Sequence, residues 1–353
     1  MPASSHQSIR SAVAVTIERC AERDIGDVVR FLDEHWQRGH ALVASRRLLD
    51  WQHRNPDGSY SFVVARVDGA CAGILGYIPT RRFDPALAGD NVVWLTTWKV
   101  REDAGVAGLG LAMLHRLTAI EPHVAIGASG FNVATRPIYD ALGFAVGELE
   151  HYARANPGRR EFALASFSEQ RGRRSSSTSA IATRALSTAA DFERAGEIAT
   201  GVPRKTARYF HARYACHPLY SYRVLAIEDG GRTVALLATR IAEHAGHRAL
   251  RIVDFAGAPE AIAALGGIVD ALLEETGAEY ADVYHAGLDP SLFARAGFTR
   301  VDPDGADVVP DHFEPFERRN VRLWFAIKGR TGAVVFKGDG DQDRPNIVRD
   351  ERR

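Results

Sequence analysis

The chain has 353 residues, of which 46% are hydrophobic and 25% are charged, as in ordinary soluble globular proteins and unlike disordered or fibrous ones. The 44 basic and 44 acidic residues balance, which argues against nucleic acid as the main partner. Three cysteines are too few for a disulfide framework or a zinc site, so we expect no metal and a cytoplasmic location. No stretch has the apolar length of a signal sequence or a membrane span.

The first half is predicted to alternate strands and helices. A strand at 13–19 and helices at 24–35 and 44–53 precede strands at 61–67 and 71–79, which a hairpin turn at Asp68-Gly69 connects. An apolar strand at 91–100, a glycine-rich turn and a helix to about residue 120 follow. The pattern then predicts a strand at 123–129, a helix at 135–142 and closing strands at 144–153 and 161–166.

A polar, serine-rich and basic segment, "SEQRGRRSSSTSA" at 168–180, divides the chain almost in half and is typical of a linker. The second half repeats the order of the first, which indicates a duplication. We therefore predict domains at 12–166 and 181–330, a linker at 167–180 and a polar tail at 331–353. The repeat rests on "SYRVLAIEDG" (221–230) echoing "SFVVARVDG" (61–69), on the helix at 259–276, and on "PSLFARAGF" (290–298) matching "RPIYDALGF" (136–144).

The glycine-rich turn "AGVAGLGLAML" (104–114) lies between a strand and a helix, where backbone N–H groups and the helix dipole favour an anion. A nucleotide-binding Walker loop is excluded because no Gly-Lys-Ser/Thr follows. A dinucleotide-binding fold is disfavoured because Met113 stands where a third glycine belongs, and the next strand ends without an acidic residue. A helix cap with glycines for close packing stays open.

The segment "FNVATRPIYDALGF" (131–144) narrows these choices, because Asn132 lies seven residues before Tyr139 and Gly143-Phe144 follow. Together with the glycine turn, this motif resembles the GNAT superfamily of acyl-CoA-dependent N-acyltransferases over about residues 12–166. The resemblance implies an α/β (α+β) fold of two tandem GNAT-like domains, each a twisted mixed sheet flanked by helices. Its cofactor would be acetyl-CoA or another acyl-CoA, whose pantetheine arm enters between splayed strands.

The resemblance also assigns roles to residues. The CoA pyrophosphate would lie on the N–H groups of Gly105, Val106, Ala107, Gly108, Leu109, Gly110 and Leu111, and Trp98, Lys99 and Val100 would pair with pantetheine. Asn132 would help position the cofactor, and Tyr139 would protonate the departing thiolate. Gly105 departs from the family, which has glutamine or arginine there, and this weakens the expected phosphate grip.

An amine acceptor must lose a proton before or as it attacks, so a base or a water relay is expected. The strand at 91–100 carries no carboxylate, and Asp90 lies just outside it. Other candidates are Asp50, His53 and His151, and the sequence does not choose among them.

The second half repeats the order of strands and helices but lacks the residues expected to bind CoA and to donate a proton. Pro259 and Glu260 stand where amides would receive phosphate, and Phe293, which has no proton to give, stands at the position of Tyr139. We therefore expect one CoA site and one degenerate domain.

Two further stretches, "YFHARYACHPLYSYRV" (209–224) and "FKGDGDQDRPN" (336–346), together with "LLDWQ" and "ILGYIPT", resemble tandem GNAT-like proteins of bacterial surface-polysaccharide and glycoprotein gene clusters. That resemblance implies an amino-sugar acceptor, nucleotide-linked. A peptide, polyamine or antibiotic amine is an alternative acceptor, and a binding protein with a vestigial CoA site is an alternative function. The two stretches could equally be an ordinary connection and a solvated tail, and the oligomeric state is open. The candidate substrate-binding residues are Trp51, His53, Arg213, His217, Tyr220, Asp341, Asp343 and Arg344.

Overall fold

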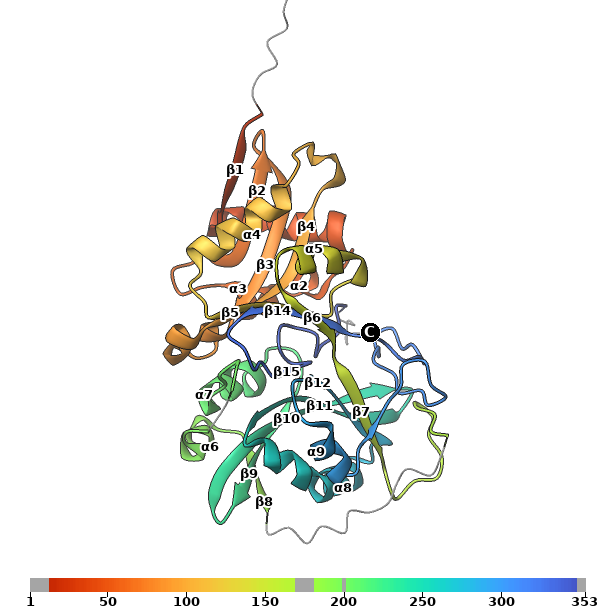
Figure 1. Ribbon diagram of the computed structural model, residues 1–353. Coiled ribbons are helices and arrows are strands. Elements are labelled where there is room, and N and C mark those ends of the chain that lie inside the picture. The colour runs from red at the N-terminus through yellow and green to blue at the C-terminus, as the bar shows by residue number, and fades with distance from the viewer. Residues whose placement is uncertain (1–12, 169–180, 199–200, 348–353) are drawn as a thin grey trace, which may run out of the picture.

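The computed structural model describes residues 13–168, 181–198 and 201–347 of the chain. These residues form two mixed β-sheets flanked by helices, the first in the upper part of Figure 1 and the second in the lower part. The predicted fold class, two mixed sheets with flanking helices, is confirmed. Most of the predicted linker, residues 169–180, lies outside the described residues.

The first sheet has the strand order β1-β2-β3-β4-β5-β14-β6. Helix α4 packs on one face through Leu109, Met113 and Leu117, and helices α1 to α3 cover the other face, around Phe62. The β2–β3 hairpin turns at Asp68 and Gly69, whose φ angles of 48° and 82° suit the predicted turn. The elements from the first half are β1 (Val15–Cys20), η1 (Glu22–Asp24), α1 (Ile25–Phe31), η2 (Leu32–Trp36), α2 (Ala41–Ala44), α3 (Arg46–His53), β2 (Tyr60–Val67), β3 (Ala70–Pro79), η3 (Thr80–Arg82), η4 (Pro85–Asp90), β4 (Val92–Val100), η5 (Glu102–Ala104), α4 (Leu109–Ile120), β5 (Ala125–Ser129), η6 (Val133–Thr135), α5 (Arg136–Ala141) and β6 (Ala145–Glu148).

The second sheet has the order β13-β7-β12-β11-β10-β9-β8, and β15 pairs with β12 beside this path. Helix α8 packs on one face through Val269 and Leu273, and Phe210 and Tyr214 pack on the other. The predicted helix at 259–276 begins with a 3-10 segment before α8. The elements are β7 (Glu150–Ala155), β8 (Ala182–Leu186), α6 (Ala189–Ala195), α7 (Ala207–Phe210), η7 (His211–Ala215), β9 (Arg223–Asp229), β10 (Arg232–His244), β11 (His247–Gly257), η8 (Pro259–Ala264), α8 (Leu265–Thr276), β12 (Tyr280–Ala286), α9 (Pro290–Arg295), β13 (Thr299–Arg300), β14 (Trp324–Gly329) and β15 (Val335–Phe336).

The two sheets exchange one strand each. Strand β14, from near the C-terminus, lies between β5 and β6, with Phe325 opposite Ser129 and Ala326 opposite Val146. In the same way β7 lies between β12 and β13 of the second sheet. Figure 1 shows the blue β14 in the upper sheet and the yellow-green β7 in the lower one. Neither half therefore completes its sheet alone. The domain ranges 12–166 and 181–330 stay predictions, and each predicted range contributes one strand to the sheet of the other.

Two predicted strands differ from the structure. The predicted strand 144–153 is two strands, β6 and β7, which separate at Leu149 and enter different sheets. The predicted strand 161–166 is wrong, because within it only Ser166 makes a bridge, to Val308. The reason is the exchange: the partner that closes the first sheet comes from 324–329, so no local closing strand is needed.

Most of the segment 335–344 is buried, which excludes the alternative of a solvated tail there. Lys337, Asp339, Asp341, Asp343 and Arg344 are each at most 8% exposed. Charges at this depth require partners, and the ion pairs described below supply them. Residues 348–353 lie outside the described part of the chain.

Candidate functional site

Strands β4 and β5 diverge after a short parallel pairing. Their register runs from Val92 opposite Ala125 to Leu95 opposite Ala128 and then stops. Strand β4 continues to Val100 and pairs there only with β3, through Leu75 opposite Trp98 and Gly73 opposite Val100, after a bulge. The β5-facing backbone edge of Trp98 to Val100 is thus free to pair with an extended, amide-containing ligand.

The glycine turn lies next to this free edge. A Cβ added at Gly110 would stand 3.2 Å from the Trp98 indole nitrogen and 3.7 Å from a Val100 methyl group, so glycine permits the close approach of helix α4 to β4. Gly105 and Gly108 have φ angles of 66° and 73°, in the left-handed region that favours glycine. The predicted cofactor residues 98–100 and 105–111 are therefore adjacent in space.

The backbone N–H groups of residues 105–111 are unengaged by the described chain. The first hydrogen bond at this end of α4 runs from Ala112 N–H to the Gly108 carbonyl, at 3.0 Å. Orphan amides at a helix start, with the positive end of the helix dipole behind them, bind phosphate oxygens. The charged side chains of the turn are self-paired, since Arg101 contacts Asp103 at 2.8 Å and Lys99 lies 3.9 Å from Glu102. An anion here would rest on amides.

Tyr139 lies on α5, almost fully buried among aromatic rings. Its ring centroid is 4.6 Å from that of Phe131, 5.2 Å from Phe144 and 6.2 Å from Trp98 of the free strand edge. Burial raises the pKa of Tyr139 to about 12, so the phenol keeps its proton at neutral pH. Its hydroxyl makes no hydrogen bond to the described residues, which leaves it available as a proton donor.

Asn132 has a structural role in the segment that follows β5. Its Oδ1 accepts a hydrogen bond from Ala134 N–H at 3.0 Å and caps the short turn η6. That cap holds the segment that leads from β5 into α5.

The four candidate bases are all engaged elsewhere. Asp50 accepts hydrogen bonds from Arg46 and Tyr60, and Asp90 pairs with Arg330 and Arg204, which hold the pKa of Asp90 low.

Both histidines are buried. His53 bonds to Ser61 at 2.8 Å, and burial keeps its pKa well below the usual value. His151 bonds to Asp282 within the second sheet at 2.9 Å. No contact of these two or of the carboxylates singles out a base at the point where β4 and β5 diverge.

Sequence reasoning missed two hydroxyl groups at that point. Thr96 follows Leu95 and Ser129 follows Ala128, the last paired residues of β4 and β5. Both hydroxyl oxygens are buried without a partner among the described residues. Threonine and serine are too common in strands for the sequence to have singled them out.

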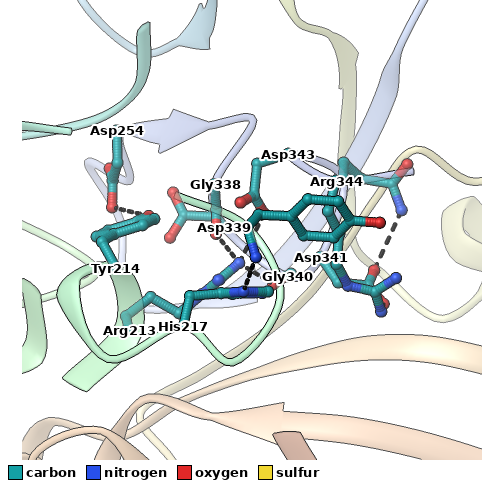
Figure 2. A network of polar contacts seen from close by, with 12 residues as sticks. Arg213, Tyr214, His217, Asp254, Gly338, Asp339, Gly340, Asp341, Asp343 and Arg344 are labelled. Atoms are coloured by element: carbon teal, nitrogen blue, oxygen red, sulfur yellow. Dashed lines mark hydrogen bonds and ion pairs between the residues drawn. The ribbon is translucent and has the colours of Figure 1, made fainter. Parts of the chain in front are cut away.

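The predicted substrate-binding residues gather in one network between the two halves. Figure 2 labels Arg213, His217, Asp341, Asp343 and Arg344 of this set. Arg213 donates to the Asp343 carboxylate at 2.6 Å and to the carbonyls of Gly338 and Gly340. Its guanidinium lies 5.5 Å from the Trp51 ring centroid, and the Trp51 ring lies 4.5 Å from that of His217. Segments far apart in the sequence are thus joined by one buried cation.

The remaining predicted residues lie at the edges of this network. Arg344 pairs with Asp341 at 3.0 Å and donates to Gln52, which in turn contacts His53 at 3.1 Å. Burial and the nearby Arg213 lower the pKa of His217 to about 3, so its ring stays neutral. These ion pairs and hydrogen bonds connect the C-terminal segment to residues of both halves, and we call this contact the lock around Arg213. The Tyr220 hydroxyl and the His217 Nε2 are buried and lack a partner among the described residues.

A second buried cluster was not predicted from the sequence. Lys205 donates to Asp254 at 2.5 Å and to Asp339 at 3.0 Å, and Tyr214 donates to Asp254 at 2.7 Å. Burial raises the pKa of Asp339 to about 6, although Lys205 opposes this. Its members come from four separated segments, so no local spacing could have indicated it.

The second sheet has a matching divergence, and the chain itself fills it. Strands β11 and β12 pair in parallel only from Ala249 to Ile252. Beyond that point β15 pairs with β12, and Gly338 N–H donates to the Val253 carbonyl of β11 at 2.7 Å. The backbone edges that would receive pantetheine in this half are therefore occupied. Phe293, at the position of Tyr139, stacks on His285 at 4.2 Å.

The described residues contain no group of three or more metal-ligating side chains arranged to hold a metal ion. Within the same ranges, no helix has the length and apolar character needed to cross a membrane.

No protein-family model and no curated protein matches the chain. Two solved structures resemble it over both halves. One is a GCN5-related N-acetyltransferase from Anabaena variabilis ATCC 29413, with a TM-score of 0.51 at 11% identity over 88% of this chain and 72% of that one. The other, from Enterococcus faecalis V583, is a conserved protein of unknown function described as a probable N-acyltransferase, with a TM-score of 0.51 at 10% identity over 90% and 73% of the two chains. The chain has the GNAT fold. At these identities the likeness shows the fold alone.

Proposed function

We propose that the protein is an acyl-CoA-dependent N-acyltransferase that transfers an acyl group, most simply acetyl, to a primary amine. The observation that carries this proposal is the divergence of β4 from β5 beside a turn whose backbone amides are unengaged. A free strand edge suits the amides of pantetheine, and a helix start suits a pyrophosphate. The second half offers no equivalent, because β15 fills its divergence.

The acyl-CoA would supply the acyl group as a thioester. In the proposed reaction the amine nitrogen forms a bond to the acyl carbon, the carbon–sulfur bond breaks, and the amine gives up a proton. Backbone amides near Val100 stabilise the negative charge that develops on the carbonyl oxygen. Tyr139, protonated at neutral pH, gives its proton to the departing sulfur and regains a proton from solvent before the next turnover.

The proton of the amine leaves through water in this proposal. The Thr96 and Ser129 hydroxyls are buried at the divergence without partners, and buried hydroxyls of this kind bind ordered water. A water held there would connect the amine to solvent, and this role needs no side chain of shifted pKa.

We propose an amino sugar of a surface-glycan pathway, free or nucleotide-linked, as the acceptor. The support is the cavity beside the interface network, where aromatic rings, arginines and carboxylates line one space. Peptides, polyamines and antibiotic amines are the alternatives. Release of free CoA across an amine panel separates these classes, and release by peptides alone would rule out the glycan acceptor.

A binding protein with a vestigial CoA site is the second candidate. It is favoured by Gly105 and by Glu102 and Asp103, whose carboxylates engage the basic side chains nearest the turn. Absence of a thermal shift with millimolar acetyl-CoA would support it.

The first experiment compares Leu111→Glu with Ala119→Glu, at the first and last turns of α4. Both side chains are exposed, and a glutamate at the helix start is favourable for the helix itself. A charge about 4 Å from a phosphate costs about 1 to 4 kcal/mol, so we expect at least fivefold weaker acetyl-CoA binding by calorimetry for Leu111→Glu. Ala119→Glu should bind as the parent does. Equal affinities for both variants would refute the cofactor site.

A further inference from the structure

A polar cavity of about 380 Å³ lies between the two halves. Its walls come from the second sheet, through residues of β10, β11 and β12, from the stretch 311–323 and from the C-terminal segment 337–347. Gly130, directly after β5, and Gln342, whose side chain fills the space beside Gly130, complete it on the side of the first sheet. The cavity therefore reaches the end of β5, next to the divergence proposed to hold the thioester.

Most charged groups that line the cavity form ion pairs, either with one another or with residues outside the lining. Arg251 contacts Asp282 at 2.6 Å and Asp311 at 2.9 Å, and Lys337 also pairs with Asp311. Arg240 and Glu314 differ, because neither forms an ion pair with any described residue. A cavity with one unmatched guanidinium and one unmatched carboxylate suits a ligand that carries both charges.

Arg240 is held in place without being neutralised. It donates one hydrogen bond to the Asp343 backbone carbonyl at 2.9 Å, and its guanidinium lies 4.8 Å from the Tyr220 ring centroid. The Tyr220 hydroxyl is buried and has no partner among the described residues. A stacked guanidinium with free N–H groups beside a spare hydroxyl is a preorganised anion site.

We propose that this cavity binds the acceptor amine, and that the acceptor is a monosaccharide-sized amino sugar carrying a phosphate or carboxylate group, which Arg240 recognises. Glu314 attracts the ammonium group of the incoming amine. The volume lies near the lower end of the range for ligand sites, which favours a single sugar over a nucleotide-linked one. The inference rests on the proposed acyltransferase function. Measurements of sugar binding without acetyl-CoA test the acceptor site separately from acyl transfer.

The test measures binding by calorimetry without acetyl-CoA. The probes are glucosamine 6-phosphate, muramic acid as the carboxylate-bearing amino sugar, glucosamine without an anion, and glucose 6-phosphate without an amine. The variants are Arg240→Gln, Arg240→Lys and Glu314→Gln, and Arg232→Gln is the matched control at the exposed start of β10. Thermal melting establishes that each variant is folded.

We expect Arg240→Gln to weaken glucosamine 6-phosphate or muramic acid binding at least tenfold, as loss of a charged hydrogen bond implies, and to leave glucosamine unchanged. Whichever of the two anionic sugars binds more tightly identifies the anion. Arg240→Lys should restore part of the affinity, because it keeps the charge without the planar fork. Glu314→Gln should weaken the amino sugars and spare glucose 6-phosphate.

The outcomes separate the two proposals. Equal binding of anionic sugars by the parent, Arg240→Gln and Arg232→Gln, or no binding of either, would overturn the inference. Arg240-dependent binding with no CoA release in the presence of acetyl-CoA would support the anion site and count against the acyltransferase. Turnover of uncharged amines only would support the acyltransferase and overturn the anionic acceptor.

Discussion

Replacing Tyr139 by phenylalanine tests whether this residue donates a proton during the proposed acyl transfer where β4 and β5 diverge, and it disturbs the fold little. The ring packs against Phe131, Phe144 and Trp98, and phenylalanine keeps these contacts. The hydroxyl has no hydrogen-bond partner among the described residues, so its removal leaves no group there unsatisfied. We therefore expect a change of less than about 1 kcal/mol in the free energy of unfolding.

The expected loss lies in turnover. A positioned acid contributes about 10²-fold to 10⁴-fold to a proton-transfer step, so kcat for acetyl transfer should fall about a hundredfold or more. The acetyl-CoA dissociation constant should change less than twofold, because the cofactor contacts proposed here are backbone groups of Trp98 to Val100 and of residues 105–111. Stopped-assay detection of free CoA gives kcat, and calorimetry gives the dissociation constant.

The pH profile supplies an independent readout. Because burial raises the pKa of Tyr139 to about 12, the acid stays protonated across the neutral range, and kcat should show no alkaline fall below about pH 10. Tyr280→Phe is the matched control, since it removes a buried unpartnered hydroxyl from the second half. Unchanged kcat in Tyr139→Phe, or equal losses of kcat and acetyl-CoA affinity, would mean that the tyrosine is only part of the scaffold.

Two further predictions concern stability. Asp343→Asn should lower the free energy of unfolding in urea by about 3–5 kcal/mol, because it leaves the buried Arg213 cation unpaired. Asp304→Asn, whose side chain is 77% exposed, should lower it by less than about 1 kcal/mol. Similar losses in both variants would contradict a stabilising contact between the halves at Arg213. Burial lowers the pKa of His285 from 6.5 to about 3. Below pH 6.5 the unfolded chain therefore binds a proton at this residue and the folded chain does not, so the free energy of unfolding decreases as the pH is lowered. From pH 7 to pH 5 this amounts to about 2 kcal/mol, which His285→Phe should remove; an unchanged pH slope would contradict it.

The elements of each half could be predicted because their signals are local. The Asp68-Gly69 turn fixed one hairpin, and the glycine turn at 105–110 marked the start of α4. The spacing from Asn132 to Tyr139 placed α5 after β5, and the matching Gly143 and Gly297 have φ angles of 74° and 75°. These features depend on backbone conformation within a few residues, which a single sequence encodes directly.

The strand exchange could not be predicted from the sequence. A strand such as 324–329 has the same alternation whether it pairs with its own half or with the other, because the pleat period fixes which face is buried and not which neighbour is paired. The same limit applied to residues 336–346. Their aspartates and glycines are typical of an exposed tail, whereas in the structure the distant Lys205 and Arg213 pair with Asp339 and Asp343.

The C-terminal segment contacts both the divergence of β11 and β12 and the proposed acceptor cavity. Its residues Val335 to Gly338 fill the divergence of β11 and β12, so the strand edges there are occupied by the chain itself. Gln342 and Asp343 then line the cavity that reaches Gly130 at the end of β5, with Asp343 held there by Arg213. The lock around Arg213 therefore has a functional consequence, since loosening it would shift a wall of the proposed acceptor site. In the proposed function the second half holds no CoA, and it contributes by anchoring the segment that lines the proposed acceptor cavity.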